Sequence, residues 1–420
     1  MINNQKKYKK LKFSPMYGAL GRESVHPFPA RMAPSIALKI VREAKKPLRV
    51  LDPMMGSGTV LALARANGHR GIGIDIDPLA VLISKVWTTA INGKNVRKKA
   101  IEVLASARKI FLDLLAHDAY PRHVDEKTKD FIDYWFDRET RRKLTALSGV
   151  ISGIKDSSTR NALRCAFSRL IITKQSGASL AMDLSHSRPH KCFDKAPIDV
   201  FEKFLSAVDK VVDNCVDIND KQRGPKTVVK KGDARKLPLK DESVDIVLTS
   251  PPYLNAIDYM RCSKFSLVWM GYKVDDIRQL RTESVGSEAG SHIASSDKNV
   301  QFVLRKLKLN PCLTPRNEAI LARYIYDMSS SIKEVARVLS PAGKAVYVVG
   351  ENMIRGTYIR NSTVMKVVAG ATGLKLQKKQ IRILPANRRY LPPPPSEHSK
   401  HDVAMNTRMR REVIMTFSKS

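Results

Sequence analysis

The residues best suited to chemistry stand in one short stretch, Asp245-Ile246-Val247-Leu248-Thr249-Ser250-Pro251-Pro252-Tyr253. An apolar run bounded by turn formers predicts a buried strand of a parallel sheet. The Pro-Pro pair cannot continue a ladder, so it forces an extended turn just past the strand's carboxyl end, where open α/β sheets bind ligands. A serine hydroxyl, a proline carbonyl and a tyrosine ring held there could grip a planar ring that carries an exocyclic amine.

A glycine-containing turn is the second candidate. Leu48-Arg49-Val50-Leu51 predicts a strand, the turn Asp52-Pro53-Met54-Met55-Gly56-Ser57-Gly58-Thr59 follows it, and residues 60–67 predict a helix. Glycines let a backbone approach a ligand, and a helix start supplies free N–H groups. No Lys-Ser/Thr pair follows the glycines, which disfavours a phosphate-gripping P-loop. A purely structural tight turn is the alternative interpretation.

Three acids complete the set of candidates. Asp75 ends the next predicted strand, residues 71–75, about twenty residues after the turn, the spacing at which an acid receives ribose hydroxyls. Asp77 is the better candidate to cap the following helix. Asp233 follows a predicted strand at 227–230, and an adenine contact and an ordinary turn aspartate are both open for it. The turn and Asp75 together favour an adenosine-containing ligand.

The elements that position these residues predict a Rossmann-like, doubly wound α/β sheet with an all-helical insertion. The insertion carries apolar residues at helical spacing, among them Ile101, Leu104, Ile110, Phe111 and Leu115. A charged stretch at about 273–300 predicts a mobile loop. The expected organisation is a basic arm at 1–24, a catalytic domain formed by 25–94 and 226–420, and the helical insertion at 95–225, as a candidate nucleic-acid-binding or target-recognition region.

The charge points to a polyanionic partner. Lys and Arg number 74 against 40 Asp and Glu, a formal net charge of +34. Nucleic acid is the first candidate, although an architectural protein would show the same charge. The candidate phosphate contacts are Arg188, Lys191, Arg355, Arg388 and Arg389.

The 5 cysteines form no C-x-x-C pair, which disfavours a zinc site or a disulfide framework and fits buried thiols in a reducing cytosol. We expect no metal. No apolar run approaches the ~20 residues that span a bilayer, and no secretory signal is seen, so a cytoplasmic protein without membrane contact is expected.

Taken together, Thr249-Ser250-Pro251-Pro252-Tyr253 and Asp52-Pro53-x-x-Gly56-Ser57-Gly58-Thr59 resemble the S-adenosylmethionine-dependent amino-methyltransferases of DNA. Within these, Ser-Pro-Pro-Tyr is more typical of cytosine-N4 enzymes and Asp-Pro-Pro-Tyr of adenine-N6 enzymes. His26-Pro27-Phe28-Pro29-Ala30-Arg31-Met32 resembles the family's N-terminal motif, which packs beside the methionine moiety. The family's target-recognition region lies between its motifs or at one end, and here the helical region precedes Asp233.

The resemblance implies S-adenosylmethionine as cofactor, a ribose contact from Asp75 and an adenine contact from Asp233. It implies that Ser250 and the Pro251 carbonyl accept hydrogen bonds from the target amine, that Pro252 completes the turn, and that Tyr253 stacks on a base flipped out of the duplex. The implied cofactor-binding residues are Phe28, Pro29, Asp52, Met54, Gly56, Gly58, Thr59, Asp75, Asp233 and Ser250.

The leading hypothesis is a DNA cytosine-N4 methyltransferase of a restriction-modification or defence system, with a cognate endonuclease as a candidate partner. Adenine-N6 methylation of DNA and base-amine methylation of RNA, for instance at guanine N2, are rivals. A catalytically idle nucleic-acid-binding protein with the same fold is a more remote alternative. Carbon-5 cytosine methylation is disfavoured because no cysteine has a suggestive setting.

Overall fold

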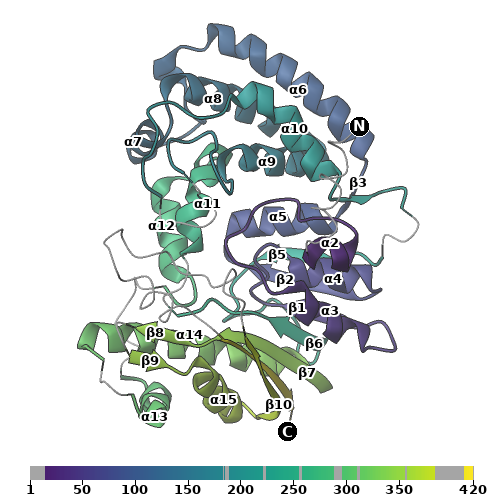
Figure 1. Cartoon of the computed structure of the whole chain (residues 1–420), viewed down its shortest axis with the longest axis vertical. Helices are drawn as coiled ribbons and strands as arrows, with labels where there is room; N and C mark the ends of the chain where they lie inside the picture. Colours follow the sequence, from purple (N-terminus) through teal and green to yellow (C-terminus); the bar gives the residue numbers. More distant parts are fainter. Residues whose placement is uncertain are drawn as a thin grey trace, which may run out of the picture. The chain divides into compact units, whose positions relative to one another are not determined.

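The computed structural model describes residues 15–182, 184, 189–220, 224–254, 258–287, 296–309, 313–354, 357–383 and 411–419 (Figure 1). The chain divides into two compact units, and each is assembled from three separate stretches. Unit 1 consists of Met1–Pro47, Met55–Lys231 and Tyr259–Leu280; unit 2 consists of Leu48–Met54, Gly232–Asp258 and Arg281–Ser420. Each unit is described by itself below.

Unit 1 contains α/β elements that follow the predicted rhythm. Helix α4 (Thr59–Ala66) begins after Gly58, strand β2 (Arg70–Asp75) follows, and helix α5 (Pro78–Thr88) begins at the Asp77 cap. Strand β5 (Val228–Lys231) pairs with β2 in parallel, with Ile72 opposite Val228. Helices α2 (Pro15–Leu20) and α3 (Pro34–Arg42) precede these elements, so the first helix lies within the predicted basic arm. Residues 1–14 of that arm lie outside the described residues.

The remainder of unit 1 is mainly helical. Its helices are α6 (Gly93–Asp113), α7 (Glu126–Trp135), α8 (Arg138–Ser152), α9 (Ser157–Ile171), α10 (Val200–Val212) and α11 (Tyr259–Leu267). Short 3₁₀ turns lie at Ala116–Asp118 and Val268–Met270, and short strands β3 (Ala90–Ile91) and β4 (Val216–Asp217) pair in parallel. An aspartate caps the first turn of α7, α8, α9 and α10 by accepting backbone N–H groups, as expected of Asp at this position.

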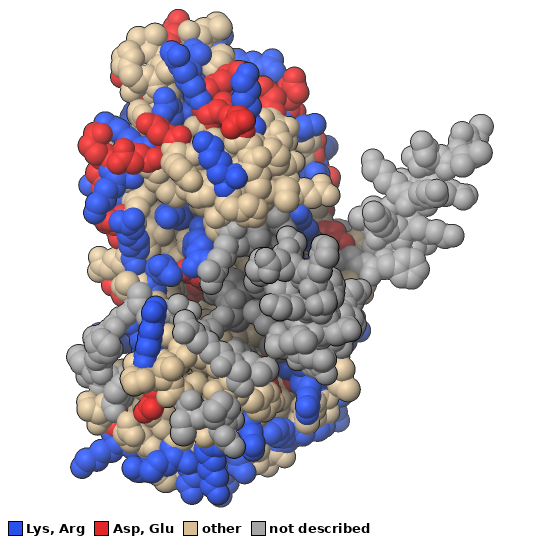
Figure 2. All heavy atoms as spheres, turned by 60° about the vertical axis from the view of Figure 1, so that its left-hand side comes forward, with Lys and Arg blue, Asp and Glu red and all other residues tan. Residues whose placement is uncertain are grey.

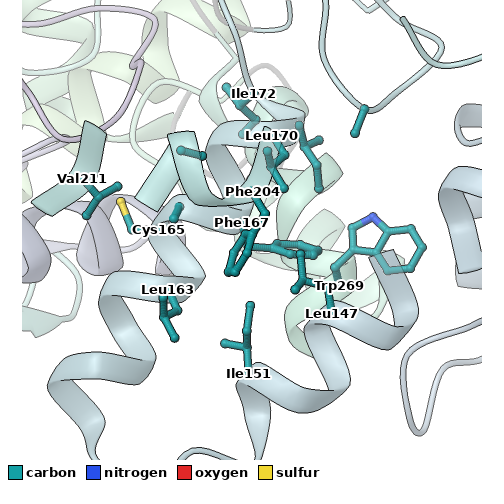
Figure 3. Packing of buried hydrophobic residues seen from close by; sticks show 14 of the residues in the cluster. Leu147, Ile151, Leu163, Cys165, Phe167, Leu170, Ile172, Phe204, Val211 and Trp269 are labelled. Atoms are coloured by element: carbon teal, nitrogen blue, oxygen red, sulfur yellow. The ribbon is translucent and has the colours of Figure 1, made fainter. Parts of the chain in front are cut away.

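One hydrophobic core joins the helical region to elements outside it. Leu147 and Ile151 of α8, Leu163 and Phe167 of α9 and Phe204 of α10 pack together, and Trp269 reaches the same cluster from the turn after α11 (Figure 3). The cluster also includes α5 side chains. Residues 95–225 therefore share their core with segments predicted to belong to the catalytic domain, and the predicted domain boundaries stay a prediction.

Helix α6 forms where the apolar spacing predicts a helix, but a different face of it is buried. Val96, Ala100, Val103 and Ala107 are buried, together with Leu104. Ile101, Ile110 and Leu115, which were also named for the helical spacing, are exposed. The smaller residues recur at the same helical spacing, and they allow α8 and α10 to approach closely.

Among its described residues, unit 2 contributes five neighbouring strands to the main sheet, in the order β10-β11-β7-β6-β1. Strands β1 (Arg49–Asp52), β6 (Val244–Thr249) and β7 (Leu339–Gly350) are parallel to one another, whereas β11 (Arg411–Lys419) is antiparallel to both β7 and β10 (Leu374–Ile383). Thr249 lies opposite Tyr347, and Gly350 lies opposite Glu412. The end of β6 and the beginning of β11 therefore lie at the same edge.

Helices α14 (Pro315–Val338) and α15 (Asn361–Ala371) pack beside these strands in unit 2, with α13 (Lys298–Leu307) against both helices. A hairpin of β8 (Asn352–Ile354) and β9 (Thr357–Ile359) follows β7.

The predicted fold class, a Rossmann-like α/β sheet with an all-helical insertion, is confirmed. The mobile loop predicted at about 273–300 is wrong for residues 274–283, which form helix α12 (Val274–Glu283) with Val274 and Ile277 buried. Two apolar contacts one turn apart are enough to hold this charged helix. Of the described helices, none is long and apolar enough to cross a membrane.

Candidate functional site

The glycine-containing turn of unit 1 is wrapped tightly by its neighbours. Gly56 and Gly58 have φ angles of +49° and +82°, which L side chains rarely adopt. A Cβ atom on Gly58 would lie 2.6 Å from Ser84 Oγ and 3.1 Å from Ser84 Cα. Ser84 Oγ donates a hydrogen bond to the Gly56 carbonyl at 2.8 Å, and the Gly56 N–H donates to Asp75 at 2.8 Å. The turn is thus held from α5 and from the end of β2.

The turn fits a bound cofactor. The side-chain hydroxyl of Thr59, at the start of α4, is buried and has no hydrogen-bond partner among the described residues. An unsatisfied buried hydroxyl is uncommon in proteins and calls for a partner. The first turn of α4 also has no side-chain cap for its N–H groups. Hydrogen-bonding groups of a bound molecule could pair with the Thr59 hydroxyl and with the free N–H groups of α4. Gly56, Gly58 and Thr59 therefore fit the predicted cofactor site.

Asp75 ends β2 beside this turn, and its carboxylate holds the local backbone. One oxygen accepts the Gly56 N–H and the other accepts the Asp77 N–H at 2.9 Å. Burial and the neighbouring Asp77 carboxylate together raise the pKa of Asp75 to about 7, against the lowering effect of the N–H donors. Asp77 caps α5, as predicted, and it also accepts a hydrogen bond from Ser263 of α11 at 2.6 Å.

The N-terminal motif places Phe28 against the same turn. The Phe28 ring stacks on Tyr259 of α11, with centroids 5.6 Å apart and an interplanar angle of 24°. A Cβ atom on Gly56 would lie 3.1 Å from the Phe28 ring. Phe28, Gly56 and Asp75 are therefore brought together within unit 1, as the sequence predicts. Pro29 is half-buried next to Phe28.

His26 anchors this motif through a buried chain of hydrogen bonds. Its Nε2 lies 2.9 Å from Ser168 Oγ of α9, which in turn lies 2.7 Å from Ser266 Oγ of α11. Its Nδ1 donates to the Pro27 carbonyl, so Nε2 accepts from Ser168. Burial, together with the nearby Arg169, lowers the pKa of His26 to about 3, so the ring is neutral. Ser168 and Ser266 could not be found from the sequence, because a serine within a helix belongs to no recognisable motif.

In unit 2, Asp52 and Asp233 lie in turns and are already engaged. Asp52 ends β1, is buried, and accepts the Met54 N–H at 3.2 Å. Asp233 forms an ion pair with Arg235 at 2.7 Å, and Arg235 also pairs with the buried Asp327 of α14 at 2.7 Å. Burial raises the pKa of Asp327, and Arg235 partly opposes this shift. A carboxylate oxygen can accept more than one hydrogen bond, so Asp233 can still receive an amine.

The Ser-Pro-Pro-Tyr turn lies at the end of β6, as predicted, and contacts β7 and β11. Ser250 Oγ donates to the Val348 carbonyl at 3.1 Å and lies 3.3 Å from the Tyr253 hydroxyl. The Tyr253 hydroxyl donates to Glu412 Oε1 at 3.4 Å, and Glu412 pairs with Arg382 of β10 at 2.7 Å. Pro251 is buried and Pro252 is half-buried. Glu412 and Arg382 were missed by the sequence reasoning, because only the pairing of β10, β11 and β7 brings them to this edge.

Most of the predicted phosphate contacts cannot be placed. Arg188, Arg355, Arg388 and Arg389 lie outside the described residues. Lys191 is exposed, with its ammonium group 5.5 Å from the centre of the Tyr134 ring. Figure 2 shows Lys and Arg mixed with Asp and Glu over the upper part of the view, whereas Lys and Arg predominate at its lower edge. Unit 2 exposes Lys298, Arg305 and Lys306 of α13 and Lys375, Lys378 and Lys379 of β10.

The cysteines do not form a reactive cluster in the described part of the chain. Cys165, Cys215 and Cys262 are buried, as predicted, but Cys192 is exposed. Burial raises the pKa of the Cys165 thiol to about 12. Among the described residues there is also no group of three or more His, Cys, Asp or Glu that could hold a metal ion.

Comparisons with known proteins bear on the whole chain. No family model matches it. Type II methyltransferase M.MvaI of Kocuria varians is 28% identical over 353 residues, 79% of this chain and 77% of that protein. Type II methyltransferase M.AvaI of Nostoc sp. is 24% identical over 389 residues, 82% of this chain and 77% of that protein. A solved SAM-dependent methyltransferase from Methanosarcina mazei covers 91% of this chain and 96% of its own, at 9% identity and a TM-score of 0.33. The relatives confirm the resemblance that the motifs indicate.

Proposed function

We propose that this chain, a homologue of the Type II DNA methyltransferases, transfers the methyl group of S-adenosylmethionine to the exocyclic N4 amine of a cytosine flipped out of duplex DNA. The bound cofactor supplies an electrophilic methyl group on a sulfonium. The name Type II of the relatives supports a place in a restriction-modification system with a cognate endonuclease. The high positive charge of the chain supports DNA as the partner.

The observation that carries the proposal is the direction of the Ser250 hydrogen bond. The Ser250 hydroxyl lies within donating distance of the Val348 carbonyl and of the Tyr253 hydroxyl, so its single hydrogen points to one of these two groups and both oxygen lone pairs stay available. Ser250 is thereby arranged as a neutral acceptor for an amine N–H. A carboxylate at position 250 would instead face the Val348 carbonyl oxygen, which disfavours the Asp-Pro-Pro-Tyr arrangement here. This supports the cytosine-N4 assignment over adenine-N6.

The chemistry needs an amine whose lone pair is localised. An exocyclic amine conjugated to its ring is a poor nucleophile, because its lone pair is delocalised into the ring. Ser250 and the Pro251 carbonyl accept its two N–H groups and draw it toward tetrahedral geometry, and the Tyr253 ring stacks on the base. The remaining requirement is proximity and in-line orientation, which binding can supply. On the cofactor side, Phe28, Gly56, Gly58, Thr59 and Asp75 bind and orient the donor.

The organisation of the chain along the sequence supports a role for its helical part in DNA binding. We assign residues 95–225 to nucleic-acid contact, with Lys191 as its phosphate contact among the described candidates, and the exposed cations of α13 and β10 as further ones. Phosphate contacts of this kind give affinity and register and carry no sequence information.

The decisive experiment identifies the modified nucleoside. The protein is incubated with donor labelled in its methyl group and with whole-genome-amplified DNA, which carries no modified bases, or with RNA from the same cells. Digestion and chromatography should recover N4-methyldeoxycytidine from the DNA alone. Recovery of N6-methyldeoxyadenosine would overturn the base assignment, and label in RNA would overturn the substrate class. Calorimetry that finds no heat of donor binding would favour a catalytically idle nucleic-acid-binding protein.

A further inference from the structure

Glu412 is a charged group that contacts the proposed target site through Tyr253 and that the proposed function does not yet use. It begins β11, opposite Gly350 at the end of β7, and the end of β6 lies at the same edge. Its side chain is only 13% exposed. One carboxylate oxygen receives the Tyr253 hydroxyl and the other receives Arg382, so the group has a cation on one side and a proton donor on the other.

The three side chains form a directed row. Ser250 Oγ lies 3.3 Å from the Tyr253 hydroxyl oxygen and can donate to it, and the Tyr253 hydroxyl donates to Glu412 at 3.4 Å. The serine hydroxyl can turn between the Val348 carbonyl and Tyr253, because both lie within hydrogen-bonding distance. Each donor in the row can therefore point toward the next group, and the row ends on the carboxylate.

Methylation of an amine requires a group that accepts a proton, and the row of Ser250, Tyr253 and Glu412 could supply one. When the amine nitrogen forms its bond to the methyl carbon, the carbon–sulfur bond breaks and the nitrogen becomes positively charged. It must then lose a proton, and Ser250 is the acceptor next to it in the proposed site. Ser250 itself is a poor base, so it can take this proton only if it passes its own proton on.

We propose that Glu412 is a positioning and proton-accepting residue that acts through Tyr253 and Ser250, with Arg382 holding its carboxylate in place. One N–H bond of the methylated amine breaks as the proton passes to Ser250, the Ser250 proton passes to Tyr253, and the Tyr253 proton passes to Glu412. The product is a neutral methylamine and a protonated Glu412, and both hydroxyl groups are restored. The inference rests on the proposed function, because it needs a target amine beside Ser250.

The test compares variants that break the row at two points. Tyr253→Phe removes the hydroxyl and keeps the stacking ring, and Glu412→Gln keeps the size and removes the proton acceptor. With enzyme in excess over amplified DNA and saturating labelled donor, each variant should lower the rate of methyl incorporation by about tenfold or more, within the usual range for proton transfer. The dissociation constant of the donor should stay unchanged. The double variant should be no slower than the slower single one, since both remove the same step.

Controls separate this role from a structural one. Glu242→Gln breaks a comparable ion pair to the other end of β11, where Glu242 lies 3.0 Å from Lys419, and should keep the wild-type rate. The solvent deuterium isotope effect on the rate should be clearly above one for the wild type and near one for both variants, and Glu412→Asp should recover part of the rate. Additive defects, or an isotope effect that the variants leave unchanged, would overturn the relay.

The wild-type product distinguishes the two possible failures. If the wild type places no methyl group on a DNA base amine, the proposed function fails. If it does so and Tyr253→Phe and Glu412→Gln retain the wild-type rate, the relay alone fails. Circular dichroism and thermal unfolding of Glu412→Gln show whether the strand pairing survives. If this variant unfolds, Tyr253→Phe carries the test, since the tyrosine ring and its packing remain.

Discussion

The raised pKa of Asp75 predicts that donor binding depends on pH near neutrality. In the proposed donor site, the ionised carboxylate accepts the ribose hydroxyls in addition to the Gly56 and Asp77 N–H groups. With a pKa of about 7, only about one in eleven molecules is ionised at pH 6. The dissociation constant of S-adenosylmethionine should therefore rise about tenfold from its plateau above pH 8 to pH 6.

The variant Asp75→Asn should remove both the affinity and its pH dependence. A pKa about three units above the usual 3.8 corresponds to about 4 kcal/mol against the ionised form in the donor-free protein. The folded protein binds the Asp75 proton more tightly than the unfolded chain does. The destabilisation by the ionised carboxylate is therefore fully present above pH 7 and disappears as the pH falls below about 4. The side-chain amide of this variant offers one acceptor oxygen to the two N–H groups. The lost hydrogen bond offsets about 1–3 kcal/mol of the stability that is gained by removing the buried charge. Donor-free Asp75→Asn should thus unfold at a higher temperature than the wild type at pH 8, and at the same temperature at pH 5.

Isothermal titration calorimetry from pH 5.5 to 7.5 measures the affinity, in a range where the α-amino group of the donor stays largely protonated. Differential scanning calorimetry at pH 5 and 8 measures the stability. Asp209→Asn, which alters an exposed ion pair of Asp209 with Arg97, should keep the wild-type profile in both experiments. A donor affinity that is flat between pH 5.5 and 7.5 in the wild type would refute the reasoning, as would an Asp75→Asn variant that is less stable at pH 8.

Three further changes test the architecture of the candidate site. Gly58→Ala should lower the free energy of unfolding in urea by about 1–3 kcal/mol and weaken donor binding, because its Cβ would meet Ser84. Gly68→Ala, at a similar φ of +80° but with open space around it, should lower the free energy of unfolding by only about 1 kcal/mol and leave donor binding intact. Equal losses of stability would contradict the crowding argument. Ser168→Ala should cost about 1–3 kcal/mol because it leaves the buried His26 Nε2 without a partner, and a neutral result in urea unfolding would show that the chain of hydrogen bonds is dispensable. Arg235→Gln should lower the free energy of unfolding by about 3 kcal/mol, because it leaves the carboxylate of Asp327, which is only 3% exposed, without this partner. Arg97→Gln, which alters exposed ion pairs, should lower it by less than about 1 kcal/mol. Chemical denaturation measures both values, and equal losses would show that burial of the ion pair does not matter.

The residues whose roles follow from local sequence could be predicted, and those that depend on long-range pairing could not. The strand before Ser250 and the turn around Gly56 and Gly58 are encoded within a few neighbouring residues, because apolar runs and glycines act locally. Glu412 lies beside Tyr253 only because β11 pairs with β7, and no short window of sequence contains that pairing.

The same distinction explains the errors. Ile101 and Ile110 fit the helical spacing and are nevertheless exposed, because helical spacing indicates a helix but leaves the choice of its buried face to the partner helices. Helix α12 was missed because its charged residues outnumber its buried ones. The sequence left an adenine contact and an ordinary turn aspartate both open for Asp233, and it gave no hint that its partner Arg235 belongs to a chain of ion pairs that ends on Asp327 in a distant helix.

The interleaving of the two units limits how the molecule can be divided or recombined. Three of the five points at which the chain passes from one unit to the other lie between Met54 and Met55, between Lys231 and Gly232, and between Asp258 and Tyr259. These passages fall inside the glycine turn, just before Asp233, and shortly after Ser-Pro-Pro-Tyr. No single truncation can therefore release either unit intact, and a hybrid with a related enzyme made at one junction would combine mismatched cores. Exchange of target specificity between relatives would have to replace segments inside a unit, such as surface loops, and leave these three passages untouched.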